Sequence, residues 1–249
     1  LPIYDSNGDL VSLDTAELIG VDTGTRISLP RMDKGRSNCT ATTLADGRVL
    51  VTGGNDDLGV HSTAVLLSSD LSAFSAPIEM GASHAAHVAL LLHDGRVLVL
   101  GGQVDFTGAS SAAASIFDPS TNAFTPASSM HHGRQGMSAT LLDDGRALVV
   151  GGYSDVETGV EGTAEIYDPS TDSWSETAPL PDLRAYAAAV TLHDGRAAIF
   201  GGFNATTTPT TPLLYDASTN SWAAGAPVAL LEFAVPGAPA LAFVLPVCD

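Results

Sequence analysis

Arginine and histidine recur at matching positions along the chain. At four of these positions the dipeptide is Gly-Arg, Ser-His, Gly-Arg and Leu-Arg, in chain order. The fifth matching position has Leu-Glu. The five candidate ligand-binding residues are Arg36, His84, Arg134, Arg184 and Glu232. A guanidinium group suits bidentate contacts with carboxylates and phosphates. The set therefore predicts an anion-binding site on a protein whose formal net charge is −18.

A structural role is the alternative for these residues. Repeated segments keep structural residues in register, and each arginine could pair with the backbone or with an acid of a neighbouring repeat. Both interpretations stay open from the sequence. A second series of arginines directly follows a turn, and we expect it to bond the adjacent aspartate or the turn carbonyls. That series is Arg48, Arg96, Arg146 and Arg196.

Histidines and acidic loops are the candidates for metal binding. The histidines lack a matching carboxylate set at fixed spacing, so we expect no transition-metal site. The acidic stretches 55–57 and 153–161 lack the regular spacing of a calcium loop. Calcium is therefore an open alternative to the prediction of no cofactor. The histidines concerned are His84, His87, His131 and His132.

The composition excludes two classes of partner. There are 28 acidic residues against 10 Lys and Arg, and this surface repels a phosphate backbone, so we expect no nucleic-acid binding. No stretch reaches 18 apolar residues, so we expect no membrane insertion. The acidic balance suits a secreted protein, and we expect an extracellular or periplasmic location although no signal peptide is visible.

The elements that position these residues form a repeat. The chain carries four glycine pairs at intervals of 48, 50 and 50 residues, and an aromatic residue runs in step with them. The pairs begin at Gly53, Gly101, Gly151 and Gly201, and the aromatic residues are Phe74, Phe124, Trp174 and Trp222. Self-similarity at this period is typical of stacked or radially arranged units.

Each repeat predicts four strands, A to D. In the third repeat strand A is 136–142, an Asp-Gly turn follows at 144–145, strand B is 146–150 and strand C is 164–168. Glycine permits the positive φ of such a hairpin turn. The continuous β-branched run of strand B predicts burial on both faces. Strand D holds the aromatic residue, which we expect to be buried against the neighbouring repeat, and no apolar period predicts a helix.

The Gly-Gly end of strand B, the Tyr or Phe in strand C and the Trp or Phe of strand D resemble kelch repeats over residues 32–222. The sequence pattern DGRVLVxGG is similar to the repeats of bacterial kelch proteins and of the galactose oxidase propeller. The resemblance implies an all-β fold, a kelch-type β-propeller, with the D–A and B–C connections on one ligand-binding face. Kelch domains that bind acidic peptides use arginines at the head of strand A. The copper chemistry of the oxidase is not implied, because its crosslinked Cys and Tyr are unmatched.

The repeat length predicts five four-stranded blades in a single domain, 1–249. Four intact repeats lie at about 32–79, 80–129, 130–179 and 180–227. A split closing blade would combine 1–31 with 228–249 and remove the exposed sheet edges. Cys39 and Cys248 would then lie near the seam, either as two buried thiols or as a disulfide.

A binding module is the function that these features favour. The predicted ligand is a peptide or a glycan, anionic in character, bound at the face of the D–A and B–C loops. The alternatives are a small propeller enzyme, such as a glycan hydrolase or lyase, and a purely structural repeat scaffold. A hydrolase needs two carboxylates about 5–10 Å apart, and Glu232 is the only acid at the repeated position. The sequence therefore favours a binding role over an enzymatic one and leaves the enzyme as an alternative.

Overall fold

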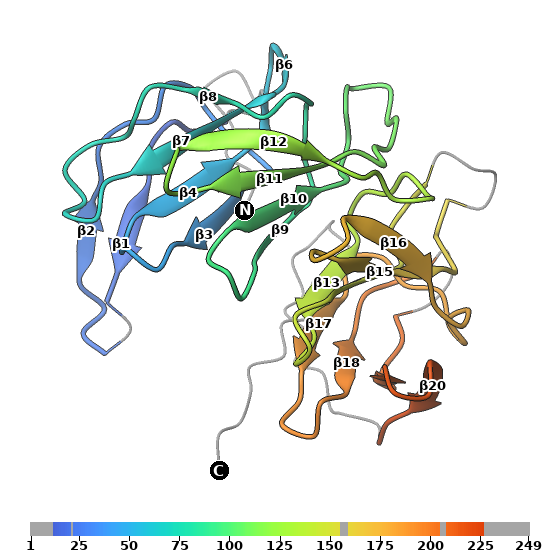
Figure 1. The fold of residues 1–249 in the computed structure, drawn as a ribbon. Coiled ribbons are helices and arrows are strands. Elements are labelled where there is room, and N and C mark those ends of the chain that lie inside the picture. Colours follow the sequence, from blue (N-terminus) through green and yellow to red (C-terminus); the bar gives the residue numbers. More distant parts are fainter. Residues whose placement is uncertain (1–11, 21, 155–158, 205–207, 227–249) are drawn as a thin grey trace. The chain divides into compact units, whose positions relative to one another are not determined.

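The computed structural model describes residues 12–20, 22–154, 159–204 and 208–226. Within these ranges the chain forms strands and no helix (Figure 1). No helix of the described part is therefore long and apolar enough to cross a membrane. The chain divides into two compact units, unit 1 (Leu1–Ala127) and unit 2 (Ser128–Asp249). The all-β fold expected from the sequence is confirmed.

Unit 1 contains two four-stranded antiparallel sheets and two short hairpins. The first sheet consists of β3 (Thr40–Thr43), β4 (Val49–Thr52), β7 (Thr63–Leu67) and β8 (Ile78–Glu79). The second consists of β9 (Val88–Leu91), β10 (Val97–Leu100), β11 (Ala114–Asp118) and β12 (Ala123–Ala127). The hairpins are β1 (Glu17–Ile19) with β2 (Arg26–Ser28), and β5 (Asn55–Asp56) with β6 (Gly59–Val60).

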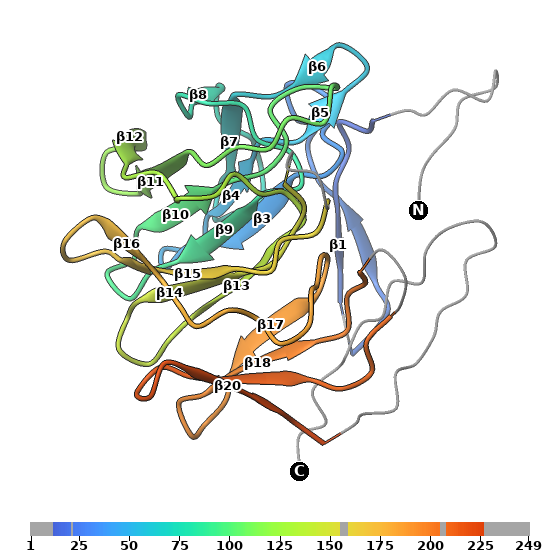
Figure 2. The same cartoon turned by 90° about the vertical axis from the view of Figure 1, so that its right-hand side faces the viewer.

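Unit 2 contains two further sheets of the same kind, which Figure 2 shows from the side. One consists of β13 (Ser138–Leu141), β14 (Ala147–Val150), β15 (Ala164–Asp168) and β16 (Ser173–Glu176). The other consists of β17 (Ala188–Thr191), β18 (Ala197–Phe200), β19 (Leu213–Asp216) and β20 (Ser221–Ala224). Each sheet contains the predicted strands A to D in order, and the second strand, B, is buried along its whole length in β10 and β14.

The predicted Asp-Gly turns join strands A and B in all four repeats. The turn glycines have φ between 82° and 86°, a conformation that L side chains rarely adopt. In the first repeat the Leu44 N–H donates to the Arg48 carbonyl at 2.8 Å, and the Gly47 N–H donates back to Leu44 at 3.0 Å. The turn chemistry of the sequence is therefore confirmed.

The glycine pairs mark places where two segments of backbone touch. A Cβ atom on Gly151 would lie 2.0 Å from the Arg184 carbonyl oxygen, and a Cβ on Gly53 would lie 2.1 Å from that of His84. Both glycines also have a positive φ. A side chain at either position would therefore force the next repeat away.

Each unit has its core between its two sheets. In unit 1 the core packs Leu50, Leu66 and Val97 with Phe117. In unit 2 it packs Leu148 and Ile166 with residues of the last sheet, among them Ile199 and Tyr215. Strand A of one sheet contacts strand A of the next within each unit, β3 with β9 and β13 with β17.

The strand D aromatics pack as predicted but are less buried than expected. The Trp174 ring lies 5.0 Å from that of Tyr167, and its Nε1 donates to the Ser128 carbonyl oxygen at 2.7 Å. Trp222 repeats this arrangement with Tyr215 and Ala178. Each tryptophan is only half-buried. Strand D is the edge strand of its sheet, so no further strand of that sheet covers these side chains.

The predicted closing blade falls largely on residues outside the described ranges. The N-terminal segment does form a hairpin, β1 with β2, as expected for outer strands. Residues 228–249 are not described, so the fifth blade and the single-domain boundaries stay predictions. Cys39 is half-buried, and its thiol lies 3.3 Å from the Arg36 carbonyl oxygen. Its predicted disulfide partner, Cys248, lies outside the described residues.

Candidate functional site

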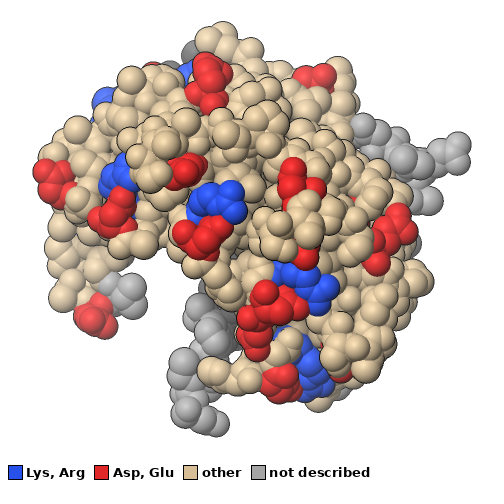
Figure 3. Space-filling view, viewed as in Figure 1, with Lys and Arg blue, Asp and Glu red and all other residues tan. Residues whose placement is uncertain are grey.

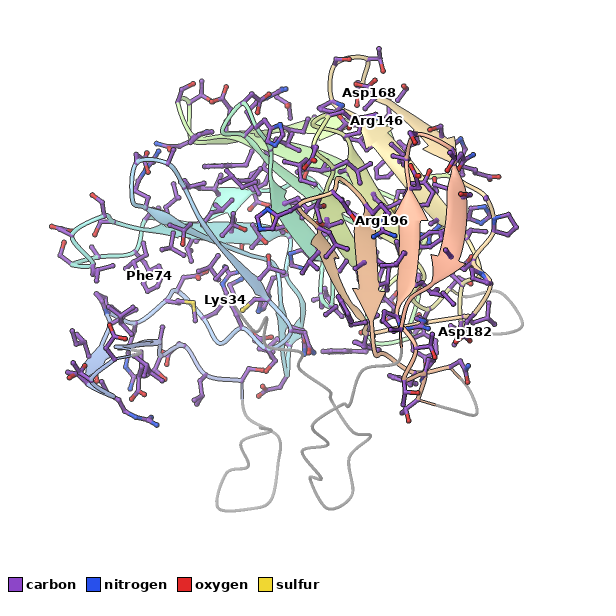
Figure 4. All side chains as sticks on the ribbon, turned by 90° about the horizontal axis from the view of Figure 1, so that it is seen from below. Lys34, Phe74, Arg146, Asp168, Asp182 and Arg196 are labelled. Carbon is purple, nitrogen blue, oxygen red and sulfur yellow. The ribbon has the colours of Figure 1, made fainter. Side chains whose placement is uncertain are left out.

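The two ends of each sheet differ in which connections they carry. The A–B and C–D turns lie at one end, the turn face. The D–A and B–C connections lie at the other end, the loop face, where the candidate residues precede strand A. In unit 2, Figure 4 labels Arg146 and Asp168 at the turn face and Asp182 at the opposite end.

The three candidate arginines are buried beneath the loop face. Arg36, Arg134 and Arg184 are 5%, 0% and 1% exposed. In each, Nη1 donates to the carbonyl oxygen of the first glycine of the same repeat's pair, at 2.8, 3.0 and 3.3 Å respectively. The guanidinium groups are therefore used inside the repeats that contain them.

The same groups also bond to strand C. Arg36 donates to the Thr63 carbonyl oxygen at 2.6 Å and to the hydroxyl at 2.9 Å. Arg134 makes the same two contacts with Thr163, at 3.0 and 2.9 Å. Each guanidinium thus ties the end of strand B to the start of strand C. Hydrogen bonds from a charged donor are stronger than neutral ones, so this tie is a strong one.

Each buried arginine also has one carboxylate partner. The pairs are Arg36 with Asp33 at 3.0 Å, Arg134 with Glu165 at 2.8 Å and Arg184 with Asp182 at 3.3 Å. A buried charge needs such a partner, because leaving it uncompensated is costly. Their positive charges are therefore balanced locally.

His84 occupies the same position as these arginines in the second repeat. Its Nδ1 lies 2.6 Å from the carbonyl oxygen of Gly101, the first glycine of its pair. The side chain is fully buried. Burial lowers the pKa of His84 below its ordinary value, so the ring is neutral at pH 7. His84 therefore bonds the corresponding glycine carbonyl as the arginines do, but it carries no charge.

The main chain of these residues joins neighbouring repeats. The Gly54 N–H donates to the His84 carbonyl oxygen at 2.8 Å, and the Gly152 N–H donates to that of Arg184 at the same distance. In His84 and Arg184 the side chain thus bonds its own repeat, and the carbonyl bonds the preceding one. We call Arg36, His84, Arg134 and Arg184 the anchor residues.

These contacts favour the structural interpretation of the anchor residues. The sequence suggested bonds to a neighbouring repeat through the side chain, whereas each side chain bonds its own repeat. In His84 and Arg184 it is the carbonyl that bonds the neighbour. Their role in binding an anion stays a prediction that no contact tests. The Nε atoms of the three arginines are buried and have no hydrogen-bond partner among the described residues. The fifth candidate, Glu232, lies outside the described residues.

Glu165 is a buried acid that the sequence analysis did not single out. It is fully buried, and besides Arg134 its carboxylate accepts from the backbone N–H and Nδ1 of His131, at 2.8 and 2.9 Å. Burial acts to raise the pKa of Glu165. The hydrogen bonds from His131 and the charge on Arg134 outweigh burial and hold that pKa below its ordinary value.

The turn-face arginines bond the turn aspartates as predicted. The Nε atoms of Arg48, Arg96 and Arg146 each donate to the aspartate two residues earlier at 2.8 Å, and that of Arg196 does so at 2.9 Å. In Figure 3 the blue Lys and Arg atoms on the face in view lie beside red carboxylates. The structural interpretation of this series is confirmed.

The histidines do not assemble into a metal site in the part of the chain that is described. His84 and His87 lie with their ring centroids 5.6 Å apart in unit 1. In unit 2 His131 contacts Glu165, and His132 contacts Glu176 at 3.3 Å. Across the described ranges no three His, Cys, Asp or Glu side chains group closely enough to hold a metal ion.

An aromatic group at the loop face of unit 2 was missed by the sequence analysis. Tyr153 and Phe203 directly follow the glycine pairs, and Tyr186 lies two residues after Arg184. The Tyr186 and Phe203 rings are stacked with an interplanar angle of 3° and centroids 5.6 Å apart. We call Tyr153, Tyr186 and Phe203 the aromatic cluster. The sequence did contain a signal for this cluster, because the residue after the glycine pair becomes aromatic in the last two repeats and the residue two after the anchor position does so in the last one.

Comparison with known proteins identifies the repeat. The family model "Kelch motif" matches residues 84–131 and 137–181. No curated protein matches the chain. Among solved structures, a fungal alcohol oxidase of the AA5 family in complex with copper is similar, with a TM-score of 0.55 and 17% identity. The match covers 92% of this chain and 61% of the oxidase chain.

At 17% identity this similarity shows the fold alone. The chain spans 61% of the length of that oxidase. The kelch motif supports a binding or scaffolding role in general terms. The motif matches and the four-stranded sheets together show the architecture. The chain therefore contains kelch motifs and has the all-β fold of a kelch-type β-propeller.

Proposed function

We propose that the protein is a binding module that recognises a peptide or a glycan at its loop face. The observation behind this proposal is a contrast between the two ends of the sheets. The turn face repeats the same Asp-Gly-Arg turn four times. At the loop face the residue after each glycine pair changes from repeat to repeat, in the order Asn55, Gln103, Tyr153 and Phe203.

Variation on a fixed backbone is what recognition requires. The frame is held by the anchor residues and the glycine pairs, so the loop-face side chains are free to differ without loss of the fold. The arginines expected to attract an anion are buried and paired. The proposed ligand therefore does not need a negative charge.

Two double variants, one at the loop face and one at the turn face, test this proposal. The loop-face variant is Asn55→Lys with Tyr186→Lys, one change in each unit, and the turn-face control is Thr121→Lys with Thr219→Lys. Both control residues are exposed. The full-length chain and both variants would be applied to a glycan array and a peptide array.

We expect the unaltered chain and the turn-face control to bind the same array members, and the loop-face variant to lose them. Far-UV circular dichroism and the melting temperature show that all three proteins are folded. Equal loss of binding in both variants, or loss only in the turn-face control, would contradict the proposed face.

A further inference from the structure

The aromatic cluster of unit 2 combines flat apolar surface with exposure. Tyr186 is 44% exposed, and Tyr153 and Phe203 are half-buried. The Tyr153 ring is tilted by 53–54° to the two stacked rings, with centroid distances of 6.0 Å to Tyr186 and 5.6 Å to Phe203. The three side chains therefore form a stacked pair beside an inclined third ring.

The backbone holds this cluster in place. Tyr153 exchanges two backbone hydrogen bonds with Gln135, at 2.7 and 2.8 Å, and Phe203 does so with Ala185, at 2.9 and 3.0 Å. The Tyr186 N–H donates to the Gly136 carbonyl oxygen at 2.6 Å. The backbone that carries the rings is thus held in place before any ligand arrives, which lowers the entropic cost of binding.

Gly136 makes room for the Tyr186 ring. A Cβ atom on Gly136 would lie 2.6 Å from Cζ of Tyr186 and 2.8 Å from both Cε atoms. Tyr186 itself has φ of 53°, a conformation that favours Gly or Asn over a bulky residue. A tyrosine at this position is therefore accounted for by the contact of its ring with Gly136 and not by its backbone.

The charges beneath the cluster are balanced. Arg134 pairs with Glu165 and Arg184 with Asp182. Burial raises the pKa of Tyr186 and of Tyr153, so both phenols keep their protons at pH 7. A surface of aromatic faces and neutral hydroxyl groups suits an uncharged ligand that has an apolar face and a polar rim.

We propose that Tyr153, Tyr186 and Phe203 bind the ring of a neutral sugar, with its C–H face stacked on the aromatic cluster. This inference rests on the proposed binding function and specifies its ligand class. Aromatic faces carry negative potential and attract the weakly positive C–H groups of a sugar ring. Ligand sites typically combine such apolar surface with a few polar groups that orient the ligand.

Affinity electrophoresis of the full-length chain tests the inference. The native gels contain one of three neutral polysaccharides, xyloglucan, galactomannan or a β-1,3-glucan. Polygalacturonate is the anionic comparison, and a decaproline peptide is titrated separately by calorimetry, because aromatic surfaces also bind proline-rich chains.

The variants remove the rings and keep the backbone. Tyr186→Asn retains a residue that tolerates the positive φ, and Phe203→Gln copies the residue of the second repeat. Phe106→Gln is the matched control, since Phe106 is a 59% exposed aromatic outside the cluster.

We expect at least one neutral polysaccharide to retard the chain and the Phe106→Gln variant equally. Tyr186→Asn and Phe203→Gln should each weaken binding by about tenfold or more, as truncation of an aromatic anchor does. The inference is overturned if no neutral polysaccharide retards the chain, if both cluster variants bind as the unaltered chain does, or if only decaproline or polygalacturonate binds. Binding of either of these last two probes would leave the proposed binding function standing.

Discussion

At the loop face, units 1 and 2 have the same backbone conformation but different side chains. In unit 1 the Ala86 N–H donates to the Asn38 carbonyl oxygen at 3.0 Å, and in unit 2 Tyr186 makes the same bond to Gly136 at 2.6 Å. All four residues have φ between 50° and 58°. The local conformation is therefore independent of which side chain occupies it.

The side chains at these positions divide the two units by chemistry. In unit 1 the Asn38 amide donates to the side-chain oxygen of Asn55 at 3.0 Å. In unit 2 the same register positions of the last repeat hold the stacked Tyr186 and Phe203. An amide pair binds through directional hydrogen bonds, whereas stacked rings bind through apolar area. The same frame thus offers two kinds of contact surface.

The layer beneath the face differs as well. In unit 2 a buried ion pair joins Arg134 to Glu165. In unit 1 the second repeat has the neutral imidazoles His84 and His87 instead, both buried. Unit 2 therefore depends on an ion pair of which both members are fully buried, whereas the second repeat of unit 1 depends on two rings that must stay uncharged.

The largest expected effect is on unit 2. Arg134→Gln would leave the Glu165 carboxylate buried without its guanidinium partner, and we expect the free energy of unfolding to fall by about 3–5 kcal/mol. Both tryptophans of the chain, Trp174 and Trp222, belong to unit 2. Their fluorescence in a denaturant titration therefore measures this loss.

Arg36→Gln in unit 1 is the comparison for that variant. Its acidic partner, Asp33, is 18% exposed at the side chain and can be hydrated when the guanidinium is gone. We expect a loss of about 1–3 kcal/mol from the bonds to neutral carbonyls, measured by hydrogen exchange of β3 and β4. Equal losses in the two variants would show that Glu165 makes no difference.

A second loss of stability is expected at the edge of unit 2. Trp174→Ala removes the contact with Tyr167 and the bond to the Ser128 carbonyl oxygen. We expect a decrease of about 2–3 kcal/mol, below the range for a fully buried aromatic side chain because Trp174 is half-buried. Circular dichroism during urea unfolding measures it. Trp174→Phe, which keeps a ring and loses the N–H, should cost about 1 kcal/mol. A decrease in the free energy of unfolding of less than about 1 kcal/mol in Trp174→Ala would contradict a role of this side chain in packing.

Acid should destabilise unit 1 before unit 2. Burial, and secondarily the charge of His84, lower the pKa of His87 to about 3. The unfolded chain takes up that proton near pH 6.5 and the folded chain does not, so stability is complete above pH 6.5 and is lost as the pH falls toward 3. The loss between pH 7 and pH 5 is about 2 kcal/mol for this one group.

Urea titrations at pH 7 and pH 5 measure this difference. Circular dichroism, which senses both units, should show an earlier transition at pH 5, while tryptophan fluorescence from unit 2 stays in place. Glu165 has a lowered pKa and costs unit 2 stability only below its ordinary range. His87→Met, which copies Met137 of unit 2, should remove most of the shift. A shift of both signals together would contradict the assignment to unit 1.

The strands and turns could be predicted from the sequence because each depends on local chemistry. An Asp-Gly turn needs a positive φ that glycine supplies, and the β-branched run beside it favours a buried strand. The expected strand C at 164–168 matches β15 residue for residue. These constraints lie within a few residues of one another, so they can be seen without the fold.

The candidate site was harder to predict because its residues meet across the repeats. Nothing in the sequence around Arg134 shows that its Nη2 donates to Glu165, 31 residues away. The aromatic cluster likewise combines Tyr186 from one D–A connection with Tyr153 and Phe203 from two B–C connections. Charge type alone suggested a surface site for the arginines. Burial decides against surface exposure, and burial depends on tertiary packing.

The smallest expected effect is at the turn face, and it serves as the control for Arg134→Gln. Arg146 is in the same repeat as Arg134, and its guanidinium bonds Asp144 at 2.7 Å with both side chains exposed by a third or more. The two oppositely charged groups are hydrated before and after the substitution, so little free energy depends on their contact. We expect Arg146→Gln to change the free energy of unfolding by less than about 0.5 kcal/mol, measured by tryptophan fluorescence in urea. Raising the salt concentration should only decrease this small value further, because salt screens an exposed ion pair. A loss as large as that of Arg134→Gln would mean that the repeated turn arginines, and not the buried anchors, hold the sheets of unit 2 together.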